Sequence, residues 1–259
     1  MRKARLALDF TLSKYEELLQ TLLGQNLKIF TVSSYLEERP GSNFAILRHD
    51  VDRKPINALR MAELENRKGI KSTYYFRYVK GVFKPEIIRR IHGLGHEIGY
   101  HYETLSKTKG DYKKALKMFE YELYEFRKIC EVKTIAMHGS HLSKYDNRNL
   151  WKCYDFKQLG VLGEAYISVK DVNYFSDTGR NWGLRNNIRD HIDDYPLVNQ
   201  YYLNTTDELI DLIKSKKVDK LYLSIHPERW TSSRIEWIQC YLRDMAFNIG
   251  KRFLARRLW

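Results

Sequence analysis

The chain has 259 residues, 43% of them hydrophobic and 14% aromatic, which is enough to bury a large core in one barrel-sized domain. Its three cysteines are widely spaced, which argues against a disulfide framework and favours a reducing compartment. The formal net charge is +13, but the basic residues are dispersed, so nucleic acid is not an expected partner. No run approaches the ~20 apolar residues of a membrane span, and we expect a soluble, cytoplasmic protein.

One basic stretch does stand out, at the end of the chain. In the segment 251–259, "KRFLARRLW", Lys and Arg alternate with aliphatic and aromatic residues. Such a segment is either a peripheral anchor on anionic lipid or the solvated end of a helix. The composition contains no further indication of a membrane partner, and none of the oligomeric state.

Helical and strand-like segments alternate along the chain. Helices are predicted from Ser13, which has capping-box spacing to Glu16, and then over 55–69, 85–93, 111–130, from Thr205 and over 232–248. Strands are predicted over 44–48, 72–76, 97–101, 134–138, 162–169 and 221–226. This alternation predicts a parallel sheet covered by helices, either doubly wound or closed as a (β/α) barrel.

Polar residues follow the predicted strands. The strand 44–48 runs into "HDVD", and later strands or segments run into "GYHYE", "MHGSH", "DTGRNW" and "HPERW". Active sites of α/β folds lie at the carboxyl ends of strands, and in a barrel these ends surround one mouth. The sequence therefore predicts one polar site built from all five segments.

Asp50 and Asp52 have the spacing expected of two carboxylates that share this site. Residues i and i+2 after a strand can face the same pocket, so one carboxylate can hold a cation while the other accepts a proton. A solvated Asp-x-Asp turn is the alternative interpretation. The buried strand directly before the pair favours the functional one.

The order of these motifs resembles that of the polysaccharide deacetylase superfamily, the family of the nodulation-type chitooligosaccharide deacetylases, over residues 45–230. The likeness is greatest to a divergent bacterial branch associated with surface-polysaccharide gene clusters. The resemblance implies a single domain over 1–259 that folds as an irregular (β/α) barrel with about seven strands. It also implies a site that binds one divalent metal, with Zn²⁺ favoured and Co²⁺, Ni²⁺ or Mn²⁺ as alternatives.

The resemblance also assigns roles to single residues. Asp50 matches the general base and Asp52 a metal ligand, while His226 matches the acid that protonates the leaving amine. His101 matches the first histidine ligand, and a structural histidine of the family falls on His96.

The second histidine ligand of the family is replaced by Leu105, which cannot bind a metal. Glu103 and His138 are the two candidates for the missing ligand, and the sequence leaves them equal, with a pocket wall that does not touch the metal as a third reading. His141 is predicted to be exposed. His49 is predicted to pack behind the site.

The arginine with which the family orients its base is also missing from its usual place. Arg180 is the predicted substitute. Asp177 and Trp182, which flank it, and Trp230 on the rim are predicted to contact the sugar. A structural tryptophan at 182 and a surface ion pair between Asp177 and Arg180 are the alternatives.

The expected activity is metal-dependent removal of an N-acetyl group from an acetamido sugar or glycan in surface-polysaccharide biosynthesis. Two alternatives remain. Because of Leu105 and the missing arginine, the chain could be a catalytically silent carbohydrate-binding protein on the same barrel. Because of its basic charge and the pair His49 and Asp50, it could be a metal-dependent phosphoester hydrolase.

Overall fold

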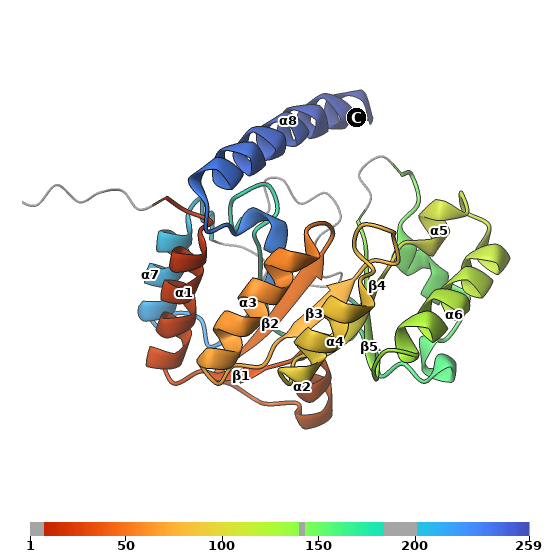
Figure 1. Ribbon diagram of the computed structural model, residues 1–259, viewed down its shortest axis with the longest axis horizontal. Helices are drawn as coiled ribbons and strands as arrows, with labels where there is room; N and C mark the ends of the chain where they lie inside the picture. The colour runs from red at the N-terminus through yellow and green to blue at the C-terminus, as the bar shows by residue number, and fades with distance from the viewer. Residues whose placement is uncertain (1–7, 140–142, 184–200, 259) are drawn as a thin grey trace, which may run out of the picture.

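The computed structural model describes residues 8–139, 143–183 and 201–258 (Figure 1). Its α-helices are α1 (Leu12–Gly24), α2 (Val32–Glu38), α3 (Pro55–Arg67), α4 (Pro85–Gly93), α5 (Thr104–Lys107), α6 (Tyr112–Arg127), α7 (Thr206–Lys214) and α8 (Arg234–Leu258). Its strands are β1 (Lys28–Phe30), β2 (Phe44–Val51), β3 (Thr73–Phe76), β4 (Glu97–Tyr102), β5 (Thr134–Met137), β6 (Gly163–Glu164), β7 (Asn173–Ser176) and β8 (Lys220–Ile225). Short 3₁₀ helices include η1 (Asn147–Lys152), η2 (Phe156–Leu159) and η4 (Pro227–Arg229).

All these strands join one eight-stranded sheet, and every described pairing is parallel. The main path runs β6-β5-β4-β3-β2-β8-β7, and β1 pairs with β2 beside it. The sheet curls into a half-barrel, with α1, α3, α4 and α6 around it (Figure 1). The predicted α/β fold of the (β/α) barrel type, with about seven strands, is confirmed.

Strand β2 pairs with β1, β3 and β8 and is buried along its whole length. Side chains alternate between the two faces of a strand. Phe44 and Ile46 belong to one hydrophobic cluster, whereas Ala45 and Leu47 belong to a second cluster with the buried faces of α1 and α7. Continued along the strand, this alternation places Arg48 and Asp50 on one face and His49 on the other.

Within the half-barrel, β4 and β3 approach closely at Gly99. A Cβ atom at Gly99 would lie 2.2 Å from ring carbons of Tyr75, its neighbour in the strand register. The Tyr75 ring is fully buried, and its hydroxyl is 2.8 Å from that of Thr134 on β5. Glycine is thus needed here because an aromatic ring occupies the space of a side chain.

The predicted helices are confirmed, with changes at their ends. Thr11, and not Ser13, caps α1, because its side chain accepts a hydrogen bond from the backbone N–H of Lys14. Thr205 caps α7 as predicted. The last helix, α8, continues to Leu258, ten residues beyond the predicted end at 248.

The strands differ more from prediction than the helices. The predicted strand 162–169 is reduced to the two residues of β6. The sequence did not indicate β1, α2 or β7, which have three, seven and four residues and are too short for a recognisable period. Among the described residues, no helix has both the length and the apolar character needed to cross a membrane.

Candidate metal and acid-base site

The carboxyl ends of β2, β4, β5, β7 and β8 surround a small pocket of about 50 Å³. Its walls contain both aspartates of the first motif and three histidines at the carboxyl ends of three different strands. The full lining is Asp50, Asp52, His101, Met137, His138, Gly139, Tyr166, Thr178, His226 and Arg229. The structure therefore brings together residues that lie up to 179 positions apart in the sequence.

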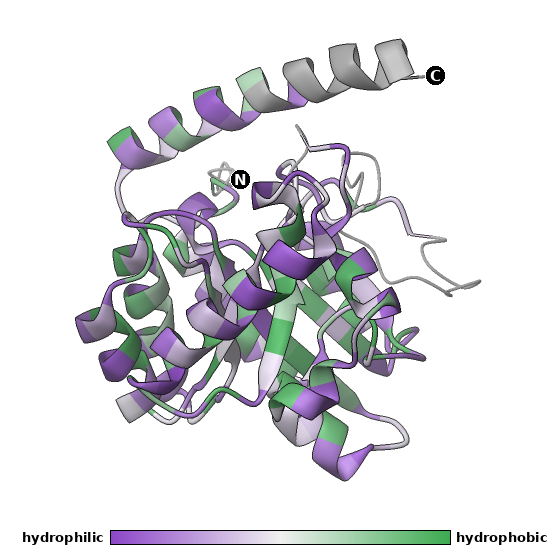
Figure 2. Cartoon of the chain, turned by 90° about the vertical axis from the view of Figure 1, so that its right-hand side faces the viewer, coloured by the Kyte–Doolittle hydropathy of each residue, from purple (hydrophilic) through white to green (hydrophobic). Residues whose placement is uncertain are grey.

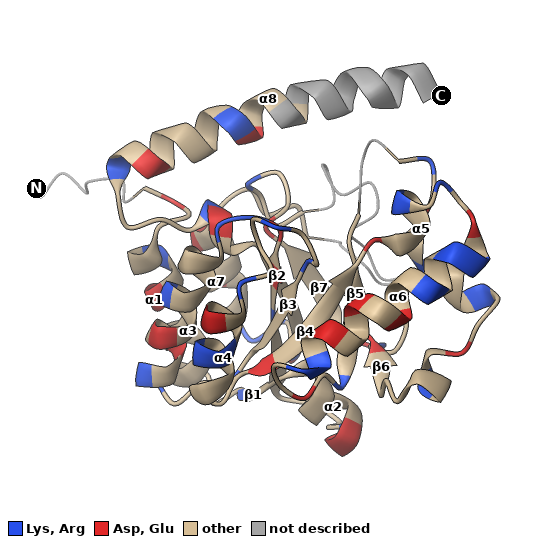
Figure 3. Cartoon of the chain, turned by 45° about the vertical axis from the view of Figure 1, so that its right-hand side comes forward, with Lys and Arg blue, Asp and Glu red and all other residues tan. Residues whose placement is uncertain are grey.

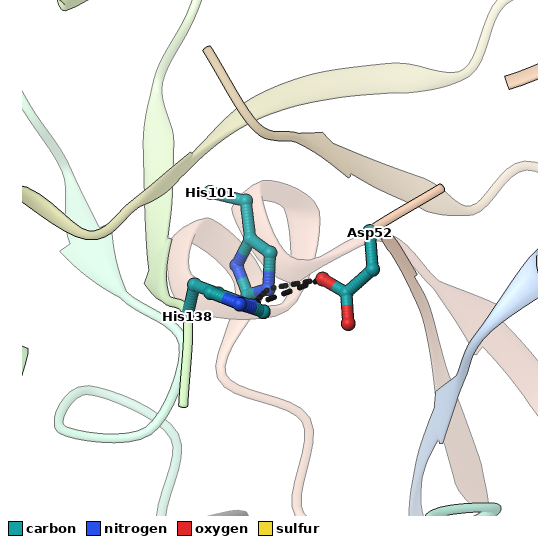
Figure 4. Close-up of side chains that lie close together, drawn as sticks. All are labelled: Asp52, His101 and His138. Carbon is teal, nitrogen blue, oxygen red and sulfur yellow. Dashed lines mark hydrogen bonds and ion pairs between the residues drawn. The ribbon is translucent and has the colours of Figure 1, made fainter. Parts of the chain in front are cut away.

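Asp52, His101 and His138 form the one group in the described part of the chain whose side chains are close enough to hold a metal ion together (Figure 4). One ligand atom from each lies within 4.8 Å of the others. Oδ1 of Asp52 is 3.0 Å from Nδ1 of His138 and 3.4 Å from Nε2 of His101. This oxygen is buried and has no hydrogen-bond donor in the described structure, so a cation between the three groups would satisfy it.

A hydrogen bond at Nδ1 of His101 leaves its other ring nitrogen, Nε2, available to bind a metal. Its Nδ1 is 3.0 Å from the backbone carbonyl oxygen of Ala136, to which it donates. The proton held there leaves the lone pair of Nε2 free on the side of Asp52, as is usual for metal-binding histidines. Burial raises the pKa of Asp52, but His138 and His101 more than offset this and hold the pKa well below its usual value. Asp52 is therefore an anion at neutral pH.

Of the two candidates for the third ligand, the geometry favours His138. The carboxylate of Glu103 is already bound by Arg77, whose Nη2 is 3.0 Å and 2.8 Å from its two oxygens. Glu103 Oε2 is 3.9 Å from His138 Nε2, the ring nitrogen that faces away from Asp52. Leu105 is buried on α5 and takes no part in the site. His141 lies outside the described residues.

Asp50 is held by an arginine that the sequence analysis missed. Arg48 Nε is 2.7 Å from Asp50 Oδ1, and Arg48 Nη2 is 2.6 Å from Oδ2, so the guanidinium binds both oxygens. Arg48 is fully buried and stacks on the ring of Tyr166 at 4.0 Å. The alternation of side chains along β2 was the available signal, because residues two apart on a strand share a face.

Arg180, the predicted partner of the base, lies elsewhere. Its guanidinium stacks on Phe10, Trp237 and Tyr241, with centroid distances of 5.0 Å, 5.1 Å and 5.7 Å. Nη1 of Arg180 forms an ion pair with Oδ2 of Asp244 at 3.8 Å. In the described structure, therefore, Arg48 is the arginine that binds Asp50, the contact predicted for Arg180. Arg180 packs under α8 instead.

His226 and Asp177 form a buried pair at the ends of β8 and β7. Nδ1 of His226 donates to Oδ1 of Asp177 at 2.6 Å, which leaves Nε2 for the pocket. Burial and the nearby guanidinium of Arg229 lower the pKa of His226, but the Asp177 carboxylate more than offsets them and raises it to about 9. The imidazole is therefore protonated at neutral pH and can act as a proton donor.

Asp177 and the two tryptophans do not contact a ligand surface. Asp177 is fully buried and accepts hydrogen bonds from His226, from Arg229 at 2.9 Å and from the indole N–H of Trp230 at 2.8 Å. Trp182 and Trp230 are fully buried in the second hydrophobic cluster, where neither ring has an exposed face for a sugar. Trp182 thus has the structural role that the sequence left open, whereas Asp177 is buried and not part of a surface pair, and Trp230 is not exposed at the rim.

His49 lies behind the site, as the sequence predicted, and belongs to a buried polar network. Its Nε2 is 2.6 Å from Glu65, which also accepts hydrogen bonds from Tyr15, Ser72 and Tyr74. His96 is 3.5 Å from the same carboxylate and fits its structural role. Burial raises the pKa of Glu65, but the neighbouring histidines and Ser72 outweigh it and bring the pKa to about 2.

Comparison with known proteins identifies only remote structural likenesses. No family model and no curated protein matches the chain. Crystal structures of BA3943, a CE4 family pseudoenzyme from Bacillus anthracis, are similar: the wild type has a TM-score of 0.41 at 16% identity, and a mutant with restored enzymatic activity has a TM-score of 0.42 at 16% identity. Each alignment covers 80% of this chain, which spans 62% and 64% of the lengths of those two chains.

Proposed function

We propose that the protein is a metal-dependent hydrolase that removes the N-acetyl group from an acetamido sugar or glycan. The observation that carries the proposal is the convergence of three separate chemical units on one pocket. These units are a ligand set, a carboxylate held by an arginine, and a protonated imidazole. Hydrolysis of an amide requires a group of each kind.

Asp52, His101 and His138 would hold the metal, because their donor set of one carboxylate and two imidazoles suits Zn²⁺ and similar ions. A bound ion of this kind supplies Lewis-acid chemistry, polarising a carbonyl and making water more acidic. We expect one divalent ion per chain.

The chain's own residues would then divide the proton transfers. Asp50, fixed by both nitrogens of Arg48, would accept the proton of the attacking water. His226, held by Asp177 and protonated at neutral pH, would donate a proton to the departing amine. Both groups line the same pocket, each one residue beyond the paired His49 and Ile225, so a substrate amide bound there could reach both.

The test compares Asp50→Asn with Asp52→Asn. Asp50→Asn should keep the fold and the metal but lower the rate of acetate release by ~10²–10⁴-fold, the usual effect of losing a positioned proton-transfer group. Asp52→Asn should lose metal and activity together, since a neutral amide is a poor substitute for an anionic ligand. Metal content and acetate release from a panel of acetamido sugars are measured on the same samples.

Three outcomes would contradict the proposal. Wild-type protein that takes up no zinc, cobalt, nickel or manganese would refute the metal site. Saccharide binding without acetate release would identify a silent binding protein instead. Release of phosphate from phosphoester substrates, with acetamido sugars left intact, would identify a phosphoester hydrolase.

A further inference from the structure

The outer face of α8 carries an apolar stripe that the described structure leaves uncovered. Ile235, Ile238, Leu242 and Met245 are 71%, 52%, 61% and 43% exposed. Their spacing of three, four and three residues places them on one side of the helix. Isolated apolar residues on a surface are ordinary, but four in a row along one helix face indicate a contact surface.

The opposite side of α8 packs on the protein body. Cys240 and Asp244 are buried there, and the indole N–H of Trp237 donates to the backbone carbonyl of Asp9 at 2.6 Å. Figures 1, 2 and 3 show α8 running across one end of the molecule, with its outer side away from the sheet. The stripe therefore faces outward because the other side of the helix is fixed to the body.

The charge on α8 is as uneven as its hydrophobicity. In the first half, Arg234 and Arg243 are balanced by Glu236 and Asp244. From Met245 to the end of the chain the sequence has four basic residues, Lys251, Arg252, Arg256 and Arg257, and no acidic residue. The helix continues through this basic segment to Leu258.

We propose that α8 docks the protein on a membrane surface of anionic lipid. The stripe of Ile235, Ile238, Leu242 and Met245 would enter the boundary between headgroups and acyl chains, and the basic end of the helix would lie among the headgroups. An apolar face joined to a basic segment is typical of helices that lie in the membrane interface. The basic residues would add attraction to anionic lipid that decreases with salt.

A second copy of the chain explains the surface less well. Four side chains from each copy are few for a stable dimer, whose interface usually buries ~1,200 Å² or more. Parallel pairing of two α8 helices would also bring their basic ends together. Lipid phosphate neutralises the same residues.

Docking through α8 also fixes which side of the protein meets the bilayer. The helix follows η4, which follows β8 and His226, so α8 lies on the side of the sheet where the candidate site opens. The lipid contact does not depend on the proposed deacetylation, and the two fail separately when tested.

The test is sedimentation of the full-length protein with vesicles of phosphatidylcholine alone and of phosphatidylcholine mixed with phosphatidylglycerol. The wild type should bind the mixed vesicles, less so in high salt. Ile238→Ser/Leu242→Ser and Arg256→Gln/Arg257→Gln should each weaken binding by roughly tenfold or more. Circular dichroism checks that the variants remain folded.

Matched controls carry the same changes away from α8. Leu23→Ser/Ile56→Ser alters residues that are 42% and 47% exposed on α1 and α3, and Lys113→Gln/Lys117→Gln removes two charges from α6. Both should bind like the wild type. Absence of binding to mixed vesicles, or equal binding by the α8 variants and the wild type, would overturn the proposal. So would light scattering that shows Ile238→Ser/Leu242→Ser converting a dimer to a monomer while vesicle binding persists.

Discussion

At the level of single residues, the two acidic residues on either side of the His138 ring have different partners. Asp52 lies between two imidazoles and has a buried oxygen without a hydrogen-bond donor, whereas both oxygens of Glu103 are bound by Arg77. A metal ion would therefore complete the surroundings of Asp52. It would have to compete with a guanidinium for Glu103.

This difference predicts which variant loses metal. His138→Gln should lower zinc affinity by about tenfold or more, because it removes one of three ligands. Glu103→Gln should retain the metal, because it removes an ion-pair partner of Arg77 and Lys107 and not a proposed ligand. Zinc content after dialysis against a competing chelator compares the two, and greater loss from Glu103→Gln would reverse the assignment.

Arg48 and Arg180 offer a second comparison. Arg48→Lys keeps the positive charge but loses the planar fork that binds both oxygens of Asp50, so kcat for acetate release should fall by ~10–10²-fold with little change in KM. Arg180→Lys should change kcat little, since that arginine stacks on rings beneath α8. Equal losses of kcat in both variants would show that Arg48 has no special part in holding the base.

The residues of the pocket could largely be predicted from sequence, but their neighbours could not. Each of these residues lies at the carboxyl end of a strand or just after it, and parallel strands bring such positions together: Asp50, Asp52, His101, His138 and His226. Whether a tryptophan beside the site is exposed depends on what packs over it. Trp182 and Trp230 are covered by segments distant in sequence, and the residues next to them in the sequence do not predict that burial.

At the level of elements, the packing of β3 against β4 leaves no room for a side chain at Gly99. Gly99→Ala should destabilise the protein by roughly 1–3 kcal/mol, because the added methyl group would lie 2.2 Å from the buried Tyr75 ring. Gly93→Ala, at the end of α4 with no atom within 4 Å of its added carbon, should be neutral or slightly stabilising. Urea unfolding measures both, and similar stabilities would contradict the described packing.

Long elements were predictable and short ones were not. The helix α6 shows its period in sequence because sixteen residues contain several turns. The strand β1 has three residues, and its assignment rests on pairing with β2, a contact between separate segments. The length of α8 was underestimated because its basic end lacks an apolar period.

At the level of the whole molecule, the buried pair of His226 and Asp177 should make stability depend on pH. The pKa of His226 is about 9 in the folded protein and ~6.5 in an unfolded chain, so the folded state binds the proton more tightly. This contribution is complete below pH ~6.5 and is lost as the pH rises through about 9. We expect a loss on the order of 1–3 kcal/mol.

Urea unfolding of metal-free protein across this pH range measures the effect. His226→Gln serves as the control, because it lacks the titrating group while other groups titrate as before. The wild type should lose its advantage over the variant as the pH rises. Parallel curves for the two proteins would contradict the prediction.

The position of β2 has a consequence for how the chain is made. Its residues 44–49 pair with 220–225 of β8, so the middle of the sheet is complete only when most of the chain has left the ribosome. Until then β2, apolar over its first four residues, presents an open edge to which other chains can add a strand. Chains that end before Lys220 should therefore aggregate during synthesis. Pairing of β8 with β2 both covers this edge and brings His226, the residue after β8, to the site.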